Sequence, residues 1–264
     1  MARPVRRPSG RVDVLGVGVD PLTVEGLHAK IGRLVRGGRG GLVLNANAHC
    51  LNLCYEDPAL RRFFGAADVV FCDGAGVMLA ARLLGRRRIP ERITYADWAP
   101  RLAAFAAAEG FSLFFLGARP GVAEAAARRL KERHPDLKIA GVRHGHFDHA
   151  AGSPESEAVV REIDAAAPDI LLVGFGMPLQ EYWLMENHHR LDVGAALTGG
   201  AVFDYASGRL GRGPRVLTDN GFEWLARLLI EPRRLWRRYL IGNPLFAWRV
   251  LRERLGVARG GKPV

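Results

Sequence analysis

Cysteine is scarce in this chain of 264 residues, which holds three: Cys50, Cys54 and Cys72. The number is odd and no C-x-x-C pair occurs. Small secreted domains depend on several paired cysteines, whereas free cysteines are typical of reducing compartments. The sequence therefore argues against a disulfide framework and predicts a reducing compartment.

Long apolar runs are also missing. No stretch approaches the roughly 18 apolar residues of a membrane-spanning helix. The first residues, MARPVRRPSGR, are basic but lack the apolar core of a signal peptide. We expect neither a signal peptide nor a spanning segment, so any contact with a membrane is expected at its surface.

Several motifs for nucleotides and metals do not occur. There is no G-x-x-x-x-G-K-[ST] phosphate loop, no G-x-S-x-G elbow and no D-x-D motif for a divalent ion under a sugar nucleotide. The G-V-G run at 16–18 lacks the third glycine of a dinucleotide fingerprint. His144, His146, Asp148 and His149 match no strong zinc spacing, which favours a solvated or substrate-facing loop over a metal site.

Positive charge, in contrast, is abundant. Lys and Arg number 38 against 27 Asp and Glu, a formal net charge of +11. Such a balance predicts an anionic partner, which could be a nucleic acid, a phosphorylated substrate or an anionic membrane surface. Hydrophobic residues make up 48% and charged residues 25% of the chain, which is ordinary for a globular protein and excludes a disordered one.

Short continuous apolar runs alternate with helical patterns over the first three quarters of the chain. Such runs suit a parallel sheet buried on both faces and covered by helices. The predicted fold class is therefore α/β, with a Rossmann-like, mostly parallel sheet whose ligands lie beyond the carboxyl ends of the strands. The predicted strands are 12–19, 41–45, 68–72, 112–116, 137–142, 169–173 and 193–197, and helices include 23–35, 76–84 and 121–133.

The pattern changes after Tyr205, where arginine becomes dense and apolar residues recur at helical spacing over 221–230 and 235–250. We predict a basic N-terminal tail at 1–11, a Rossmann-like domain at 12–205 and an arginine-rich helical appendage at 206–264.

Polar residues follow two of the predicted strands. Asn45 and Asn47 end one strand, and Asp73 ends the next. Asn amides suit sugar hydroxyls or a uracil edge, and a partly desolvated Asp can act as a general base. The alternative for each is a helix cap, because Asn and Asp are favoured there as well.

Two later strand ends are rich in glycine. Gly174 and Gly176 follow one strand, and Gly200 with Asp204 follows the other. Glycine lets the backbone approach a phosphate, and an acidic side chain can bind a ribose or sugar hydroxyl. The pattern indicates a nucleotide pocket, with tight strand-to-helix turns as the alternative.

The stretch E-P-R-R-L-W-R-R-Y at 231–239 combines arginines with aromatic residues. Arginine binds phosphate bidentately, and basic aromatic helices lie on anionic lipid. The alternative is a solvated helix face.

Taken in order, six motifs resemble the WecG/TagA/CpsF glycosyltransferase family, from about Val12 to Asn243. They are N-A-N at 45–47, D-G-A-G at 73–76, G-A-R-P-G at 117–121, G-F-G-M-P-L-Q-E at 174–181, G-G-A-V-F-D at 199–204 and the arginine-rich stretch at 231–239.

The resemblance implies an inverting transfer of a sugar, an N-acetylmannosamine-type or related hexose, from a UDP-sugar to a polyprenyl-diphosphate-linked sugar in cell-surface polysaccharide synthesis. It implies a metal-independent enzyme without cofactor or nucleic acid, whose appendage completes the site. It also implies a cytoplasmic location, peripheral on the inner face of the bacterial plasma membrane.

The resemblance also assigns residues. Asp73 matches the general base, with Asn45 and Asn47 beside it. Substrate-binding positions are Arg92, Thr94, Asp97, Gly174, Gly176, Gln180, Gly200 and Asp204, of which Gln180 and Asp204 lie on the nucleotide side. Arg233, Arg234, Arg237 and Arg238 would face the diphosphate or lipid headgroups.

Two positions depart from the family pattern: Asn45 stands where many members have Thr, and Tyr95 stands where Gly is usual. Either change could mark a different sugar specificity. Two rival hypotheses are a basic nucleic-acid-binding α/β module, prompted by the net charge, and a nucleotide-dependent oxidoreductase, which the incomplete dinucleotide fingerprint disfavours.

Overall fold

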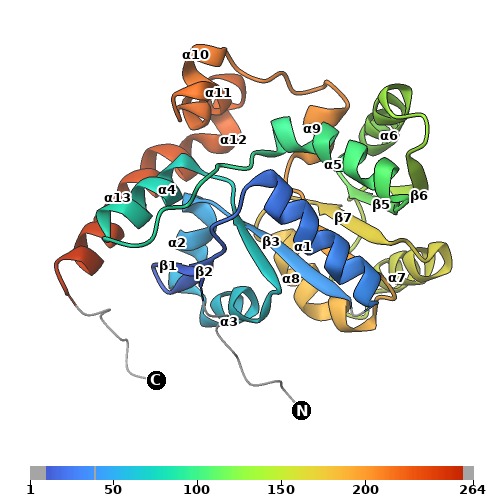
Figure 1. The fold of residues 1–264 in the computed structure, drawn as a ribbon, viewed down its shortest axis with the longest axis horizontal. Helices are drawn as coiled ribbons and strands as arrows, with labels where there is room; N and C mark the ends of the chain where they lie inside the picture. Colours follow the sequence, from blue (N-terminus) through green and yellow to red (C-terminus); the bar gives the residue numbers. More distant parts are fainter. Residues whose placement is uncertain (1–9, 39, 258–264) are drawn as a thin grey trace.

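The computed structural model describes residues 10–38 and 40–257, so most of the predicted basic tail and the last seven residues lie outside the described part. Within that part, a six-stranded sheet has the order β4-β3-β8-β7-β5-β6, and every neighbouring pair is parallel (Figure 1). The strands are β3 (Gly41–Ala46), β4 (Val69–Cys72), β5 (Ser112–Gly117), β6 (Lys138–Arg143), β7 (Ile170–Gly174) and β8 (Ala195–Thr198). The predicted α/β class with a parallel sheet is confirmed.

Alternate residues of the strands enter two different hydrophobic cores. Leu42 and Leu44 of β3 pack with the helices on one face, whereas Val43 packs with those on the other. The first core holds α2 (Ala48–Glu56), α3 (Pro58–Ala66), α4 (Ala75–Leu83), α7 (Pro154–Ala166) and α8 (Leu179–Asn187). The second holds α1 (Val24–Gly37), α5 (Tyr95–Glu109), α6 (Val122–Arg133) and α9 (Val202–Ala206). Successive residues of a strand face opposite sides of the sheet, and both sides are covered by a hydrophobic core. Every residue of such a strand is therefore buried, which explains why the runs are apolar throughout.

The prediction of one strand over Val12–Val19 was wrong. These residues form a separate antiparallel hairpin of β1 (Val12–Val14) and β2 (Val17–Val19). The chain reverses at Leu15 and Gly16, whose φ angles are 52° and 77°, and Asp13 Oδ1 accepts a hydrogen bond from the Gly16 amide at 3.1 Å. An Asp-x-x-Gly turn inside an apolar run therefore ended the strand.

The chain after α9 is helical, as predicted. Its elements are α10 (Arg215–Asp219), α11 (Glu223–Ile230), α12 (Pro232–Trp236), the π-helical η2 (Arg237–Ile241) and α13 (Gly242–Arg254). The second predicted helix is therefore present without a break, with a π-helical segment in it. Helices α10 and α11 lie at one end of the molecule, and α13 runs beside α2 and α4 (Figure 1).

A buried arginine joins α13 to α2. Arg249 is 7% exposed, donates hydrogen bonds to the main-chain and side-chain oxygens of Asn52 at 3.0 Å each, and forms an ion pair with Glu56. Phe246 and Val250 of α13 belong to the hydrophobic core of that face. The last helix is therefore packed onto the helices that cover one face of the sheet, while a domain limit near 205 stays a proposal.

In the described part of the chain, no helix is both long and apolar enough to cross a membrane.

Candidate functional site

A cleft of about 1380 Å³ opens at the carboxyl ends of the strands. Its floor comes from residues at and just after the strand ends, and its roof comes from α11, α12, η2 and α13. The floor includes Asn45, Asn47, Asp73, Gly174, Gly176, Gly200 and Asp204, and the roof includes Glu223, Arg227, Arg234, Arg238 and Phe246. The polar strand ends of the sequence are thus brought together in one cleft, as the sheet topology predicts.

Asp73 receives two amide hydrogen bonds on one carboxylate oxygen. The Nδ2 group of Asn45 donates to Asp73 Oδ2 at 3.1 Å, and that of Asn47 donates to the same oxygen at 3.4 Å. The following helix, α4, has Gly74 as its N-cap and no side-chain cap. The alternative interpretation of Asp73 as a helix cap is therefore wrong.

The pKa of Asp73 is raised from 3.8 to about 7. Burial is the largest cause, and the negative charge of Glu223 raises the pKa further. The hydrogen bonds from Asn47 and Asn45 and the charge of Arg238 act in the opposite direction. A carboxylate with a pKa near neutrality is suited to accept a proton during a reaction.

The two asparagines are held by different contacts. Asn45 is 2% exposed, and its Oδ1 accepts a hydrogen bond from the Thr198 hydroxyl at 2.9 Å, which turns its Nδ2 group toward Asp73. Asn47 is also the cap of α2, because its Oδ1 accepts from the Cys50 amide at 3.1 Å. Asn47 therefore caps α2 and contacts Asp73 at the same time, because its Oδ1 accepts the cap hydrogen bond and its Nδ2 donates to Asp73.

The glycine-rich turns are joined by Gln180 beneath the cleft. Its Oε1 accepts hydrogen bonds from the amides of Gly176 at 3.2 Å and Gly200 at 3.0 Å. Its Nε2 donates to Glu181 Oε1 at 2.7 Å. Gln180 is fully buried and does not line the cleft, so it supports the turns from below. The backbone amides of Gly176 and Gly200, which belong to the predicted nucleotide pocket, thus donate their hydrogen bonds to Gln180.

Asp204 lies at the cleft and forms an ion pair with Arg209 at 2.9 Å. A β-carbon at Gly174 would come within 2.8 Å of the Phe203 ring and 3.0 Å of the Gly200 carbonyl oxygen. Glycine is thus needed at position 174 because the two turns approach each other closely.

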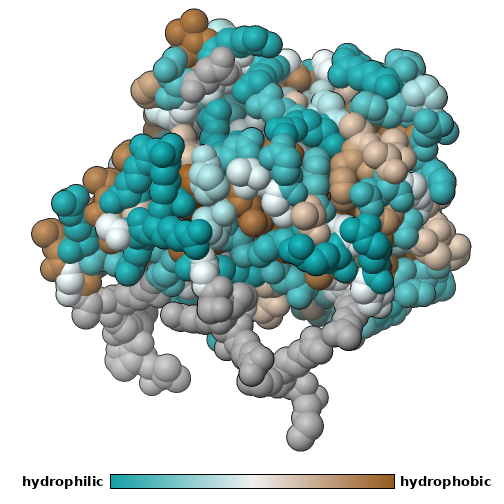
Figure 2. All heavy atoms as spheres, in the orientation of Figure 1, coloured by the Kyte–Doolittle hydropathy of each residue, from teal (hydrophilic) through white to brown (hydrophobic). Residues whose placement is uncertain are grey.

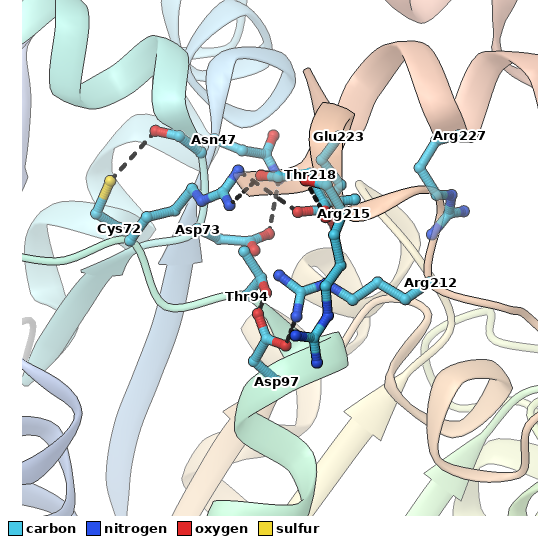
Figure 3. A network of polar contacts seen from close by, with 12 residues as sticks. Asn47, Cys72, Asp73, Thr94, Asp97, Arg212, Arg215, Thr218, Glu223 and Arg227 are labelled. Atoms are coloured by element: carbon cyan, nitrogen blue, oxygen red, sulfur yellow. Dashed lines mark hydrogen bonds and ion pairs between the residues drawn. The ribbon is translucent and has the colours of Figure 1, made fainter. Parts of the chain in front are cut away.

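The segment 92–97 contacts the C-terminal helices (Figure 3). Arg92 lines the cleft, donates to the Thr218 carbonyl oxygen at 2.7 Å and lies 3.6 Å from a Glu223 oxygen. Asp97 accepts from the Thr94 hydroxyl at 3.0 Å and pairs with Arg212. Thr94 and Asp97 do not line the cleft. These contacts hold α10 and α11 over the strand ends.

The four arginines of the 231–239 stretch divide by helical spacing. Arg234 and Arg238, four residues apart, line the cleft, whereas Arg233 and Arg237 do not. Arg234 pairs with Glu231, and Arg237 lies over the Trp236 ring at 5.2 Å. Arg238 brings its charge close enough to Asp73 to lower the pKa of that carboxyl. The arginine-rich stretch therefore presents one pair to the cleft and one pair outward.

Sequence reasoning missed several residues of the cleft. Glu223 and Arg227 of α11 line it, and Arg227 donates to the Tyr205 hydroxyl at 2.9 Å. His49 also lines it, and burial together with the charge of Arg238 lowers the pKa of His49 to about 4. The available signal for Glu223 was its acidic side chain, which follows Gly221 inside an otherwise arginine-rich segment.

The histidine loop lies at the far end of the cleft from α4. His146, Phe147 and His149 line this end beside Phe175, and the rings of Phe147 and His149 are 4.2 Å apart. Burial lowers the pKa of His149. Across residues 10–38 and 40–257, no group of three His, Cys, Asp or Glu side chains is arranged to hold a metal ion.

Comparison with known proteins identifies the family of this chain. The profile of the glycosyl transferase WecG/TagA/CpsF family matches residues 12–260. Two relatives from Staphylococcus aureus, strains MRSA252 and NCTC 8325 / PS 47, are each 27% identical over 251 residues, which cover 94% of this chain and 95% of theirs. Each is named N-acetylglucosaminyldiphosphoundecaprenol N-acetyl-beta-D-mannosaminyltransferase. With a match over nearly its whole length and a carboxylate held by two amides at the strand ends, the chain belongs to the WecG/TagA/CpsF family of glycosyl transferases.

Proposed function

We propose that this enzyme transfers a hexose, of the N-acetylmannosamine type or a related one, from a UDP-sugar to a sugar linked to polyprenyl diphosphate. The observation that carries the proposal is Asp73, a carboxylate with a pKa near 7 at the floor of the cleft. The names of the relatives specify N-acetylmannosaminyl transfer to a diphosphoundecaprenol-linked sugar, which supports this substrate class.

In the proposed reaction, Asp73 acts as the general base. Its carboxylate takes the proton from an acceptor hydroxyl while that oxygen attacks the anomeric carbon of the donor. The bond from the anomeric carbon to the diphosphate oxygen breaks, and UDP leaves with the bonding electron pair. Attack from the face opposite the leaving group inverts the anomeric centre. Arg238 and Arg234 supply positive charge for the departing diphosphate.

Donor and acceptor are proposed to approach Asp73 from opposite ends of the cleft. The glycine turns after β7 and β8, with Asp204, receive the nucleotide. Leu79 and Leu83 of α4, with Val250 and Leu251 of α13, line the other end and suit the first apolar units of a polyprenyl chain.

The outer face of the C-terminal helices suits an anionic membrane. Figure 2 shows hydrophobic atoms over α13 and over α10 and α11. Exposed large apolar residues of this region include Leu229, Trp236, Leu240, Ile241, Trp248 and Leu255. The outward pair Arg233 and Arg237 lies on the same helical segment as Trp236, and each basic residue near an anionic leaflet contributes about 1 kcal/mol before screening. We infer a peripheral position on the cytoplasmic face of the bacterial plasma membrane.

The test is turnover of a panel of UDP-sugars with a short-chain polyprenyl-diphosphate sugar. A thermal-shift screen first selects the donor, because a ligand bound only by the folded state raises its stability. Wild-type enzyme should release UDP and form a disaccharide lipid with the inverted anomeric configuration. A product of retained configuration, or no sugar transfer with any donor that binds, would contradict the proposal.

A further inference from the structure

Two consecutive side chains of α8, Gln180 and Glu181, are buried next to the cleft without lining it. Their exposed fractions are 0% and 1%. Gln180 joins the turns at Gly176 and Gly200, but the reaction described above gives Glu181 no part. A buried carboxyl group destabilises a fold unless its oxygens are hydrogen-bonded, so its presence requires an explanation.

The contacts of Gln180 require one orientation of its amide. Oε1 receives two N–H groups, from Gly176 at 3.2 Å and from Gly200 at 3.0 Å. The reversed amide would place its own NH₂ against both donors. Nε2 therefore needs an acceptor on the other side, and Glu181 Oε1 is that acceptor at 2.7 Å. The Glu181 carboxyl thus accepts the hydrogen bond that this orientation leaves to Nε2, and so stabilises the orientation in which Gln180 holds both turns.

The two turns belong to neighbouring strands of the sheet. Gly176 follows β7 and Gly200 follows β8, which pair in parallel. Both glycines have positive φ angles, 89° and 54°, and both line the cleft. A turn of this kind is easily displaced unless it is tied to a rigid element, and Gln180 ties both turns to α8.

The second oxygen of Glu181 has no hydrogen-bond partner in the described residues, and burial raises the pKa of this carboxyl to about 7. An apolar side chain would fill the same space without this desolvation cost. Packing alone therefore does not favour this arrangement. Among the described residues, the side-chain hydrogen bond of Glu181 is to Gln180, and the charge of Arg238 lowers the pKa of Glu181.

We propose that Glu181 is a positioning residue for the nucleotide half of the site, and that it acts through Gln180 on the turns at Gly176 and Gly200. The inference rests on the proposed function in one respect, namely that these turns bind the nucleotide of the donor.

The experiment is calorimetric titration of the full chain with UDP. In Glu181→Met the acceptor for Gln180 is lost, and we expect the Kd for UDP to rise about tenfold, with the KM for the acceptor unchanged. Glu181→Gln keeps an oxygen that can accept from Gln180 and should stay within about threefold of wild type. Ser156→Ala is the matched control, because it removes the 2.9 Å hydrogen bond to Trp183 of the same helix without touching Gln180.

The route through Gln180 is tested by a double-mutant cycle. If Glu181 acts only through Gln180, the pair Gln180→Met and Glu181→Met should weaken UDP binding no more than the stronger single variant. Unchanged UDP affinity in folded Glu181→Met, or losses that add in the double variant, would overturn the inference. Should Glu181→Met not fold, unchanged affinity in Gln180→Met would overturn it. A wild-type chain that does not bind UDP refutes the proposed function and this inference with it.

Discussion

Glu223 of α11 and Asp73 at the end of β4 line the same cleft, and the charge of Glu223 raises the pKa of Asp73 (Figure 3). The two residues are far apart in the sequence and meet because the C-terminal helices fold back over the strand ends. Arg238, from the same helical segment, lowers the pKa of Asp73. The C-terminal helices thus both cover the base and adjust its proton affinity.

The first prediction concerns the base itself. Asp73→Asn keeps an oxygen that can accept from Asn45 and Asn47 but cannot take a proton, so turnover should fall about 10² to 10⁴-fold. UDP affinity should change little, because Asp73 acts on the acceptor hydroxyl. Steady-state kinetics with the selected donor, together with UDP titration, checks both values. Turnover within a few-fold of wild type would remove Asp73 from this role.

The second prediction is the pH dependence of the reaction. Asp73 works as the carboxylate, and its pKa is about 7, so kcat/KM should fall about tenfold per pH unit below 7 and level off above it. Glu223→Gln removes a charge that raises this pKa and should move the midpoint to lower pH. Arg238→Gln removes a charge that lowers it and should move the midpoint to higher pH. Shifts of both variants in the same direction would contradict the electrostatic assignment.

The third prediction links Asp73 to stability. Its folded pKa of about 7 lies above the ordinary 3.8, so the folded chain holds this proton more tightly than the unfolded chain does. The resulting stability is fully present below about pH 4 and is lost as the pH rises through 7. Asp73→Asn should therefore raise Tm clearly at pH 8 and leave it nearly unchanged at pH 4. Thermal unfolding at both pH values provides the measurement, and an equal shift at both would argue against a buried, ionised Asp73.

Much of the sheet was predictable from sequence because its strands are continuous apolar runs that end at polar or glycine residues. Val43 and Leu44 show why, since one is buried on each face. The hairpin at residues 12–19 was not predicted, because its turn residues Leu15 and Gly16 lie inside an apolar run and adopt positive φ angles. The local pattern of apolar residues predicts which residues are buried, but it does not predict where the chain reverses inside an apolar run.

For the site, the sequence predicted which strand ends carry polar groups, and the topology brought Asn45, Asn47 and Asp73 within hydrogen-bond distance. It did not predict the contribution of Glu223, because that depends on how α11 packs over the sheet. Nor could it separate Gln180, which supports the cleft from below, from the residues that line it. Both depend on tertiary packing rather than on local residue type.

The last prediction separates the two faces of the arginine-rich helices. Arg233→Gln with Arg237→Gln removes two outward charges and should weaken binding to anionic liposomes by up to about 30-fold at low salt, because each charge contributes about 1 kcal/mol at such a surface. UDP binding should not change, since neither arginine lines the cleft. Arg234→Gln with Arg238→Gln should do the reverse, lowering UDP affinity more than liposome binding.

The matched control removes the same charge elsewhere. Arg128→Gln with Arg133→Gln changes two exposed arginines of α6, a helix that packs against β6 and α9 away from the C-terminal helices. If flotation depends only on net charge, this control should weaken it as much as the outward pair does. If it depends on the face that carries Trp236 and Leu240, the control should bind liposomes like wild type, and replacing those two residues with serine should weaken flotation even at high salt, where the charges are screened.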